Sequence, residues 1–324
     1  MNANLYLHVK SFAYNGIDTE KEVAEKLRRL LADMRDVVFQ GKEENKFKVP
    51  TQLYGCCVYK NLTIIDLANK YLEGDEQVVM YSILVDMSDD YDMSYEELES
   101  KSVYDREEKE VNSMVVLNRP SENDDESKQH EQLYMQFDRY EIVYNNQSWI
   151  TLRRQILGNH PGTPETFIGE CRKYFKNLLI HANCIISLNV DNYLQTIPRK
   201  IVYYLACLND KFYEIRLQHA ENSRNANDIL ADFSGRFKLD EPGSLQMNPN
   251  KKKNLTFLFE GKDEQGKVCS QLALCEPHLK ISQVDNNYTG KSINYDSFHP
   301  RIYFCFEHSF KLEQILVGSI GPHL

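Results

Sequence analysis

The sequence lacks the features of a membrane or secreted protein. Its 324 residues contain no run of roughly 18 or more apolar residues, the length that a transmembrane helix requires. The N-terminus carries no basic segment followed by an apolar stretch, so we predict no signal peptide. Apolar residues make up 42% of the chain and charged residues 27%, the balance of an ordinary globular protein. We therefore expect a cytoplasmic protein that does not bind a membrane.

The motifs of several large enzyme classes are also missing. The sequence contains no G-x-S-x-G nucleophile elbow, no Walker A phosphate loop, no G-x-G-x-x-G dinucleotide motif and no H-E-x-x-H zinc motif. Each of these motifs positions a nucleophile, a nucleotide or a metal through a fixed local backbone geometry. We accordingly expect no cofactor.

The eight cysteines form no C-x-x-C pair. Cys269 and Cys275 would lie roughly 20 Å apart on one extended strand, because each residue adds about 3.3 Å. Zinc ligands lie about 2.3 Å from the metal, so these two thiols cannot share an ion. His299, Cys305 and His308 could still converge with a further ligand, but core and surface positions are the expectation. We predict reduced thiols and no metal site.

Charge is distributed unevenly along the chain. Residues 1–133 contain 28 acidic and 16 basic side chains, a net charge of −12, and residues 134–324 contain 20 acidic and 22 basic side chains, a net charge of +2. The two parts together give the net charge of −10. Excess negative charge disfavours nucleic-acid binding by the first part, whereas the second part permits it.

We predict an α+β fold in three parts. Residues 1–118 form an acidic N-terminal α/β region, 119–132 a linker or long loop, and 133–324 a helix-rich segment that ends in an antiparallel sheet. Proline, serine, asparagine and acidic residues cluster in the middle part, a composition typical of linkers. Helices are expected to pack on the apolar face of the sheet.

Helical periodicity and capping residues locate most of the helices. We expect helices near 19–34, 62–72, 77–87, 163–179, 198–215 and 227–237. Strands are expected at 46–58, where Pro50 favours an edge position, at 111–117, and on both sides of the turn pair Asn145-Asn146 within 134–150. Trp149, the single tryptophan, is predicted to lie in the core.

Apolar residues alternate with other residues from Asn254 to the end of the chain, as in strands with one buried face. The residues predicted to share apolar faces are Leu255, Phe257 and Phe259; Val268, Leu272 and Leu274; and Ile302, Phe304 and Phe306. The residues predicted to point the opposite way on the last of these strands are Arg301, Tyr303, Cys305 and Glu307.

Five polar residues near the C-terminus form the candidate site: His278, Lys280, Arg301, Tyr303 and His323. RNA cleavage requires a base near the 2′-hydroxyl, a cation on the phosphate and an acid for the leaving oxygen, and these residue types can supply them without a metal. If the two strands are neighbours, four of the groups lie within reach of one another. The alternative is an ordinary solvated sheet face with a histidine in a terminal loop.

Three short segments of the C-terminal region, residues 275–280, 301–304 and 320–324, resemble the closing layout of RelE-type toxins. The resemblance covers about seventy residues and implies helices on an antiparallel sheet that cleaves messenger RNA on the ribosome. By position, Glu276, Arg301 and His323 match the family's catalytic residues, with Lys280 and Tyr303 as supporting groups. The resemblance favours a toxin-like effector in a bacterial antiviral-defence or toxin–antitoxin setting.

Three functions therefore stay open. The first is a metal-independent endoribonuclease that binds RNA or the ribosome through the C-terminal sheet. The second is a non-enzymatic interaction subunit of a multiprotein defence complex, with a protein partner on the acidic N-terminal region. The third is a metal-dependent nuclease, for which Glu260 and Lys262 have the acid-x-lysine spacing and Asp240 would be a further metal ligand.

Overall fold

The structure is a computed structural model that describes residues 2–9, 16–40, 45–86, 88–100, 104–105, 110–115, 143, 146–220, 225–282 and 299–322. The chain divides into two compact units. The N-terminal unit comprises Met1–Gln129 and Gln136–Arg153, and the C-terminal unit comprises His130–Met135 and Arg154–Leu324. The boundary falls within helix α6 (Asn146–Asn159). The predicted linker, 119–132, lies outside the described residues.

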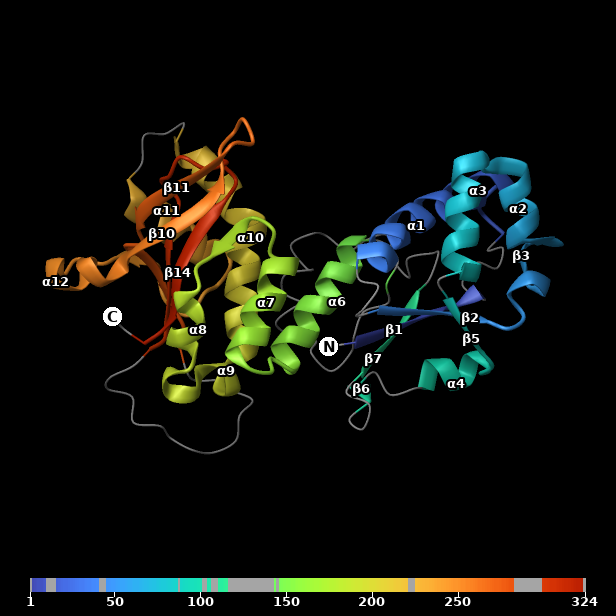
Figure 1. Cartoon of the computed structure of the whole chain (residues 1–324), viewed down its shortest axis with the longest axis horizontal. Coiled ribbons are helices and arrows are strands. Elements are labelled where there is room, and N and C mark those ends of the chain that lie inside the picture. The colour runs from blue at the N-terminus through green and yellow to red at the C-terminus, as the bar shows by residue number, and fades with distance from the viewer. Residues whose placement is uncertain are drawn as a thin grey trace. The chain divides into compact units, whose positions relative to one another are not determined.

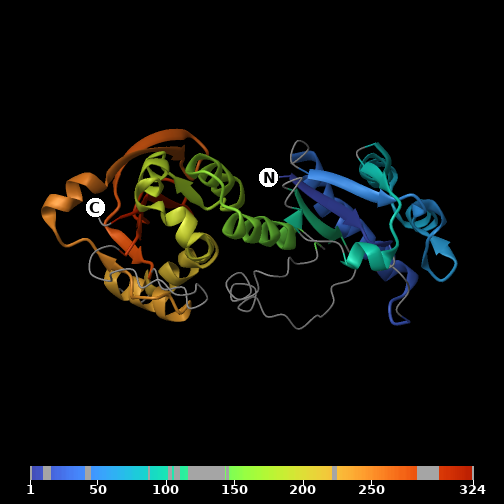
Figure 2. The same cartoon turned by 90° about the horizontal axis from the view of Figure 1, so that it is seen from below.

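The N-terminal unit is built on a five-stranded sheet of order β5-β2-β1-β7-β6. Its strands are β1 (Asn2–Leu7), β2 (Asn45–Pro50), β5 (Ser88–Tyr91), β6 (Tyr104–Asp105) and β7 (Glu110–Val115). All neighbours pair in parallel except β6 and β7. Parallel neighbours need crossover connections, and the helical segments of the unit supply them. Figure 2 shows β1 and β2 running side by side in the same direction.

The crossover segments of the N-terminal unit are α1 (Glu20–Gln40), η2 (Leu53–Gly55), α2 (Ile64–Tyr71), α3 (Gly74–Tyr81), η3 (Ser82–Asp86) and α4 (Tyr95–Ser100). A small hairpin, β3 (Cys57–Tyr59) with β4 (Leu62–Thr63), precedes α2. Helices α1, α2 and α3 lie on one side of the sheet and α4 on the other (Figure 1). The predicted capping box of α1 is confirmed, because the Glu22 carboxylate accepts a hydrogen bond from the Thr19 backbone N–H at 2.7 Å.

The edge position predicted for Pro50 is wrong. Strand β2 pairs with β1 on one side and with β5 on the other, so it lies inside the sheet. Pro50 is tolerated there because it is the last residue of the strand. The next residue, Thr51, donates its backbone N–H to the carbonyl of Tyr91 at 3.0 Å, so the pairing with β5 continues past the proline.

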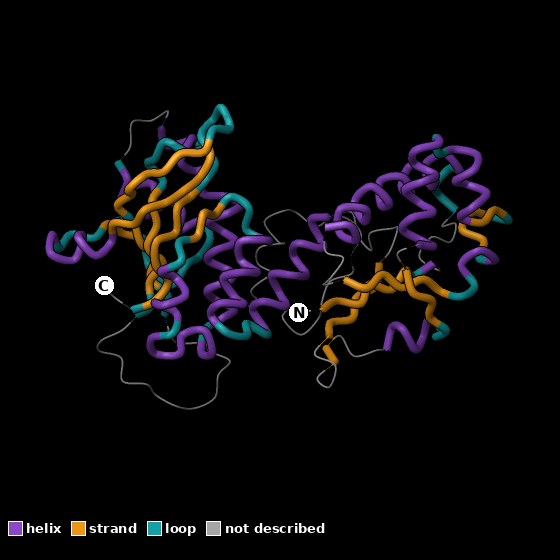
Figure 3. The backbone as a smooth tube through the Cα atoms, viewed as in Figure 1, coloured by secondary structure: helices purple, strands orange, loops and turns teal. Residues whose placement is uncertain are grey.

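The C-terminal unit also combines helices with strands, as Figure 3 shows by colour. Its helical segments are α7 (Pro164–Tyr174), α8 (Asn183–Leu188), η4 (Val190–Asn192), α9 (Tyr193–Thr196), α10 (Pro198–Ala220), α11 (Ala226–Arg236), α12 (Pro249–Lys252) and η5 (Lys253–Leu255). Helix α7 begins as predicted: the Thr163 side chain caps it and Pro164 is its first residue. No helix in the described ranges is long and apolar enough to cross a membrane.

The predicted C-terminal antiparallel sheet is a mixed sheet and a separate hairpin. The sheet has the order β8-β14-β13-β12-β9. Its strands are β8 (Leu178–Ile180), β9 (Ser244–Leu245), β12 (Pro277–Lys280), β13 (Arg301–Cys305) and β14 (Ile315–Gly321). Strand β8 pairs with β14 in parallel, because it comes from the helical segment and reaches the sheet by a long crossover. Strands β10 (Thr256–Lys262) and β11 (Val268–Leu274) pair only with each other among the described strands and form the hairpin.

One predicted strand is a helix. Helix α6 begins at Asn146, where the sequence predicted a turn between two strands. Trp149, Leu152 and Ile156 are buried at helical spacing, and this periodicity extends beyond the short window from which the strands were predicted. The burial of Trp149 is as predicted.

Both faces of the C-terminal sheet are buried. On one face, Leu279, Ile302 and Ile320 pack against the long helices in the main core. On the other face, Tyr303 and Leu316 pack against the hairpin. Strand β14 lies between the hairpin and helices α7 and α10 (Figure 1). Tyr303 and Leu316 point away from the main core, but they are buried in a second core and do not reach solvent.

One face of the hairpin is buried against the sheet, and the face that carries the larger apolar side chains of β11 is exposed. Phe257 and Phe259 are buried, as predicted, and their cross-strand partners are Ala273 and Gln271. Directly paired residues of antiparallel strands lie on the same face, so Leu272 lies with its partner Leu258 on the opposite, outer face. The predicted apolar face of β11, with Val268 and Leu274, is consequently exposed.

The ring of Phe257 lies against the backbone of Gly318, and this close approach generates a test. A Cβ atom at position 318 would lie 2.4 Å from Phe257 Cδ2 and 2.9 Å from Cys275 Sγ. We expect Gly318→Ala to lower the free energy of unfolding by roughly 1–3 kcal/mol, as overpacking does in buried cores. Urea unfolding of the full-length variants followed by circular dichroism measures the change.

Gly169→Ala is the matched control, because Gly169 lies inside α7 and a Cβ there would meet nothing within 4 Å. Alanine should leave the stability unchanged or raise it by about 0.5–1 kcal/mol, since it favours the helix. Equal changes for the two variants would contradict the close packing of the hairpin on β14.

Candidate functional site

The fold brings four of the six predicted site residues together. Strands β12 and β13 are antiparallel neighbours, with His278 opposite Tyr303 and Lys280 opposite Arg301. This is the arrangement that the sequence required for the four side chains to act jointly. His323 lies outside the described residues.

The first of these pairs belongs to a polar row that crosses the sheet. Ser244 pairs with His278, His278 with Tyr303, and Tyr303 with Ser319, so the row spans β9, β12, β13 and β14. His278 Nε2 lies 3.2 Å from Ser244 Oγ, and the rings of His278 and Tyr303 are 5.1 Å apart between centroids. His278 is 4% exposed and Tyr303 is 0% exposed. The alternative of a solvated polar face is therefore wrong for His278 and Tyr303, because both side chains are buried. Tyr303 lies in the second core, between the sheet and the hairpin.

Lys280 of the second pair forms an ion pair with a carboxylate. Lys280 Nζ lies 2.9 Å from Glu241 Oε2, and His299 Nε2 lies 3.9 Å from Glu241 Oε1. Lys280 lowers the pKa of the Glu241 carboxyl below its ordinary value. Burial lowers the pKa of the half-buried Arg301 guanidinium, and electrostatic interactions with Tyr303 and Glu241 oppose that shift. Lys280 is already paired with the carboxylate of Glu241, and this pairing reduces the attraction of Lys280 for a phosphate.

Glu276, the predicted base, is engaged elsewhere. Its carboxylate forms an ion pair with Lys252 of α12. Its backbone carbonyl lies 3.2 Å from His278 Nδ1 and accepts a hydrogen bond from the Gln246 backbone N–H. The glutamate thus contacts His278 through its backbone, while its side chain lines a groove on another side of the strand.

The residues of the metal-dependent alternative do not form a site. Glu260 and Lys262 are exposed on the outer face of the hairpin. Asp240 instead accepts hydrogen bonds from Lys200 Nζ, at 3.1 Å, and from the Ser282 backbone N–H, at 2.8 Å. Within the described ranges, no group of three or more His, Cys, Asp and Glu side chains could hold a metal ion. All eight cysteines are free thiols, as predicted.

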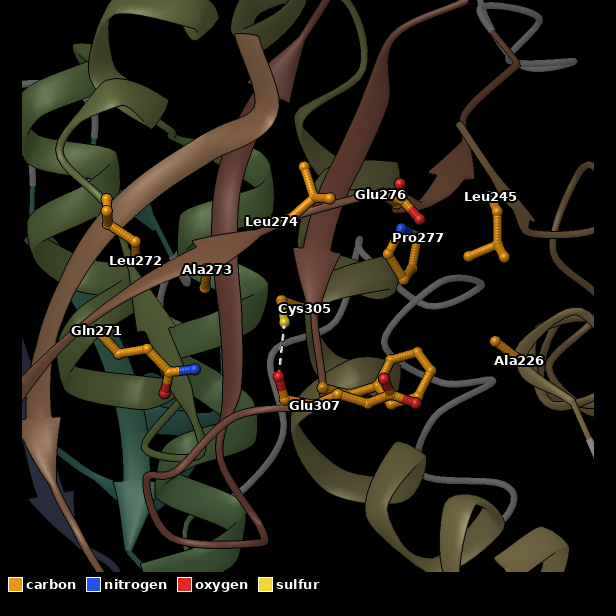
Figure 4. A pocket seen from close by; sticks show the side chains of 11 residues that line it. Ala226, Leu245, Gln271, Leu272, Ala273, Leu274, Glu276, Pro277, Cys305 and Glu307 are labelled. Carbon is orange, nitrogen blue, oxygen red and sulfur yellow. Dashed lines mark hydrogen bonds between the residues drawn. The ribbon is translucent and has the colours of Figure 1, made fainter. Parts of the chain in front are cut away.

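A groove beside the hairpin is the feature that the sequence did not predict. Its volume is about 290 Å³, and it lies along β11 on the side away from β10 (Figure 4). The residues that line it are Ala226, Leu245, Gln271, Leu272, Ala273, Leu274, Glu276, Pro277, Cys305, Phe306 and Glu307. They come from segments far apart in the sequence. The alternation of Leu272 and Leu274 with the small residues Ala273 and Cys275 was the one feature of the sequence that indicated this surface.

A further site of the N-terminal unit is expected from its topology. The strand order reverses between β1 and β7, and open parallel sheets bind ligands outside the carboxyl ends of the strands at such a reversal. There, the His8 backbone N–H donates to the Val115 carbonyl at 2.9 Å. The segments that follow the two strands, 10–15 and 116–142, lie outside the described residues, so no site is built there.

Comparison with protein-family models, with curated proteins and with solved structures finds no match to this chain. The resemblance to RelE-type toxins accordingly stays a prediction. Function has to be argued from the geometry of the described residues.

The ion pair of Lys280 with Glu241 predicts a measurable titration. In the folded protein the carboxyl pKa is depressed, so the stabilisation is present above the ordinary value of 4.5 and is lost as the pH falls through the depressed folded value. We expect Lys280→Met to raise the pKa of Glu241 towards 4.5, because the largest cause of the depression is removed. A carbon-13 NMR titration of the carboxyl group measures it.

Lys262→Met is the matched control, since Lys262 is an exposed lysine on β10. It should leave the titration of Glu241 unchanged. An unchanged titration of Glu241 in Lys280→Met would show that another cation, His299 or Arg301, lowers the pKa of this carboxyl group.

Proposed function

We propose that this chain is a protein-binding subunit and that its C-terminal unit binds the partner through the β10–β11 hairpin. The observation that carries the proposal is the exposed apolar face of the hairpin, together with the groove beside it. This proposal develops the non-enzymatic alternative of the sequence analysis, an interaction subunit of a multiprotein bacterial defence complex.

The apolar face is continuous across the two strands. Leu258 is 53% exposed and Leu272 is 67% exposed, and they are direct cross-strand partners. Side chains of such pairs lie about 4.5–5.5 Å apart between Cβ atoms, so the two leucines form one patch. Val268 and Leu274 extend the patch along β11. Contiguous exposed apolar surface costs solubility, and in folded proteins it marks interaction sites.

The predicted catalytic groups are less suited to catalysis than to structure. A general base must come within hydrogen-bond distance of the proton that it removes, and a buried histidine such as His278 offers a substrate no such approach. Tyr303 contacts the hairpin-side core, and the carboxylate of Glu241 already neutralises Lys280. The row is better explained as buried polar packing within the sheet, beside the ion pair of Lys280 with Glu241.

A metal-independent endoribonuclease is the second candidate. The cross-strand register favours it, because His278 faces Tyr303 and Lys280 faces Arg301. In this alternative, the hairpin would have to move away from the sheet for RNA to reach the row. His323 and Glu276 would then assist in proton transfer, as the resemblance implies.

An RNA cleavage assay separates the two candidates. The purified full-length chain and Arg301→Ala are incubated with end-labelled messenger RNA, with and without ribosomes. A protein-binding subunit should leave the transcripts intact in every reaction. Cleavage by the wild type that is lost in Arg301→Ala would overturn the proposal in favour of the ribonuclease. Lys280→Ala replaces Arg301→Ala if the latter does not fold, because the Lys280 side chain is partly exposed.

A photo-crosslinking amino acid in place of Leu272 provides the positive arm of the test. In cells that express the chain from its native locus, one discrete protein should crosslink at this position and not at Leu217, which is an exposed leucine on α10. Equal crosslinking at both positions would contradict a binding surface on the hairpin.

A further inference from the structure

We infer that the free edge of β11 binds an extended, basic segment of a partner protein, which adds a third strand to the hairpin. This inference rests on the proposed function and specifies the chemistry of the partner. It depends on the hydrogen-bonding register of the hairpin, on the groove and on the charge at its rim.

The register determines which backbone groups of β11 face outwards. Cys275 donates to the Leu255 carbonyl at 2.9 Å, and Asp263 donates to the Lys267 carbonyl at 3.0 Å. In antiparallel pairs, hydrogen-bonded and non-hydrogen-bonded positions alternate. Leu272 therefore occupies a non-hydrogen-bonded position opposite Leu258, and its N–H and C=O point away from β10. Leu274, two residues further along β11, also points its N–H and C=O away from β10.

This edge has no strand partner among the described residues, since β11 pairs with β10 alone. In the middle of the strand, the Gln271 side chain accepts a hydrogen bond from the Ser309 backbone N–H at 2.8 Å. Beyond it, Leu272 and Leu274 present outward backbone groups next to the groove. An unpaired edge of this kind is a template for an added strand, and peptide-binding domains use it in that way.

The groove matches the side chains of an added strand. Alternate residues of a strand point to the same side, so every second side chain of the ligand would enter the groove. Leu245, Pro277 and Phe306 give it an apolar lining. Its volume of about 290 Å³ is at the lower limit of small-molecule pockets. This volume suits a few apolar side chains better than a large ligand.

The charge at the rim selects a basic ligand. Glu307 is exposed at the groove, and no described side chain forms a hydrogen bond or an ion pair with its carboxylate. A lysine or arginine of the ligand would pair with it. A second copy of this chain is a poorer occupant, because each copy would bring an acidic rim and a net charge of −10.

Selection of peptides tests the inference directly. Random phage-displayed peptides of about ten residues, long enough for one strand, are selected on the full-length chain. We expect enrichment of β-branched and apolar residues at alternate positions with at least one lysine or arginine. A selected peptide is then made with a fluorescein label, and its affinity is measured by anisotropy.

Two proline variants on opposite edges of the hairpin distinguish edge pairing from general contact. Leu272→Pro removes an outward N–H of β11 without breaking a bond to β10, and Glu260→Pro does the same on the other edge, outside the apolar patch. Leu272→Pro should weaken peptide binding about tenfold or more, and Glu260→Pro should change it by no more than about twofold. Equal losses, or no loss, would overturn the inference.

Charge reversal provides an independent test of the ligand's chemistry. Glu307→Lys should weaken binding of a basic peptide about threefold to tenfold, and added salt should reduce the difference. Glu260→Lys, an exposed carboxylate on β10, is the control and should have a smaller effect. Equal effects of the two reversals would show that net charge, and not Glu307, attracts the peptide.

Methylation of the peptide's own amides keeps the test valid if Leu272→Pro does not fold. Methyl groups on alternate amides should abolish binding in one register and be tolerated in the other.

Failure to select any peptide, or a dimer of the chain that Leu272→Pro dissolves, would overturn the inference. If the RNA assay is still negative, a protein-binding function through another surface survives that failure. RNA cleavage that requires Arg301 would reject the proposed function itself.

Discussion

The packing of the hairpin on the C-terminal sheet is the contact on which the rest of this unit depends. Phe257 lies over Gly318, where a Cβ atom would meet the ring, and Phe259 and Leu255 extend the same buried surface. Burial of one phenylalanine side chain contributes roughly 1.5–3 kcal/mol, so these aromatic side chains can hold a two-stranded hairpin that would be marginal alone. The absent side chain at position 318 allows that approach.

This contact has two consequences on opposite sides of the hairpin. Beneath it, Tyr303 is covered, and what would have been a polar sheet surface becomes core. Above it, the leucines that the pairing places opposite the phenylalanine face are left in water. The groove forms where β11 passes across the ends of β12 and β13. Burial of the candidate catalytic row and exposure of the candidate binding edge thus have one physical cause.

Electrostatics supports the same division. Lys280 contacts Glu241, and Glu276 pairs with Lys252, so the charges near the sheet are largely balanced within the chain. Glu307 at the groove is a contrasting case, since its carboxylate faces solvent without a described partner. A charge that the fold leaves unbalanced at the rim of an apolar groove can contribute to the specificity of binding.

Much of the fold could be predicted because it is encoded locally. Thr163 and Pro164 start a helix through their own hydroxyl and ring, and periodic apolar residues locate α10 and α11. Alternation placed His278 with Lys280, and Arg301 with Tyr303, on one side of their strands, and the pairing of β12 with β13 brings them together. The region that begins at Asn146 failed because tyrosines and β-branched residues favour strands only where packing agrees.

The sequence by itself determined the helix starts, the alternation of the strands and the α+β class, because caps and periodicity act over a few residues. Only the tertiary structure decided which side of β11 is buried, whether His278 reaches solvent and where the groove lies. Those outcomes depend on the fit between Phe257 and Gly318, which are 61 positions apart in the sequence. Alternation marks two faces of a strand, but the volume available at the partner surface selects the one that is buried.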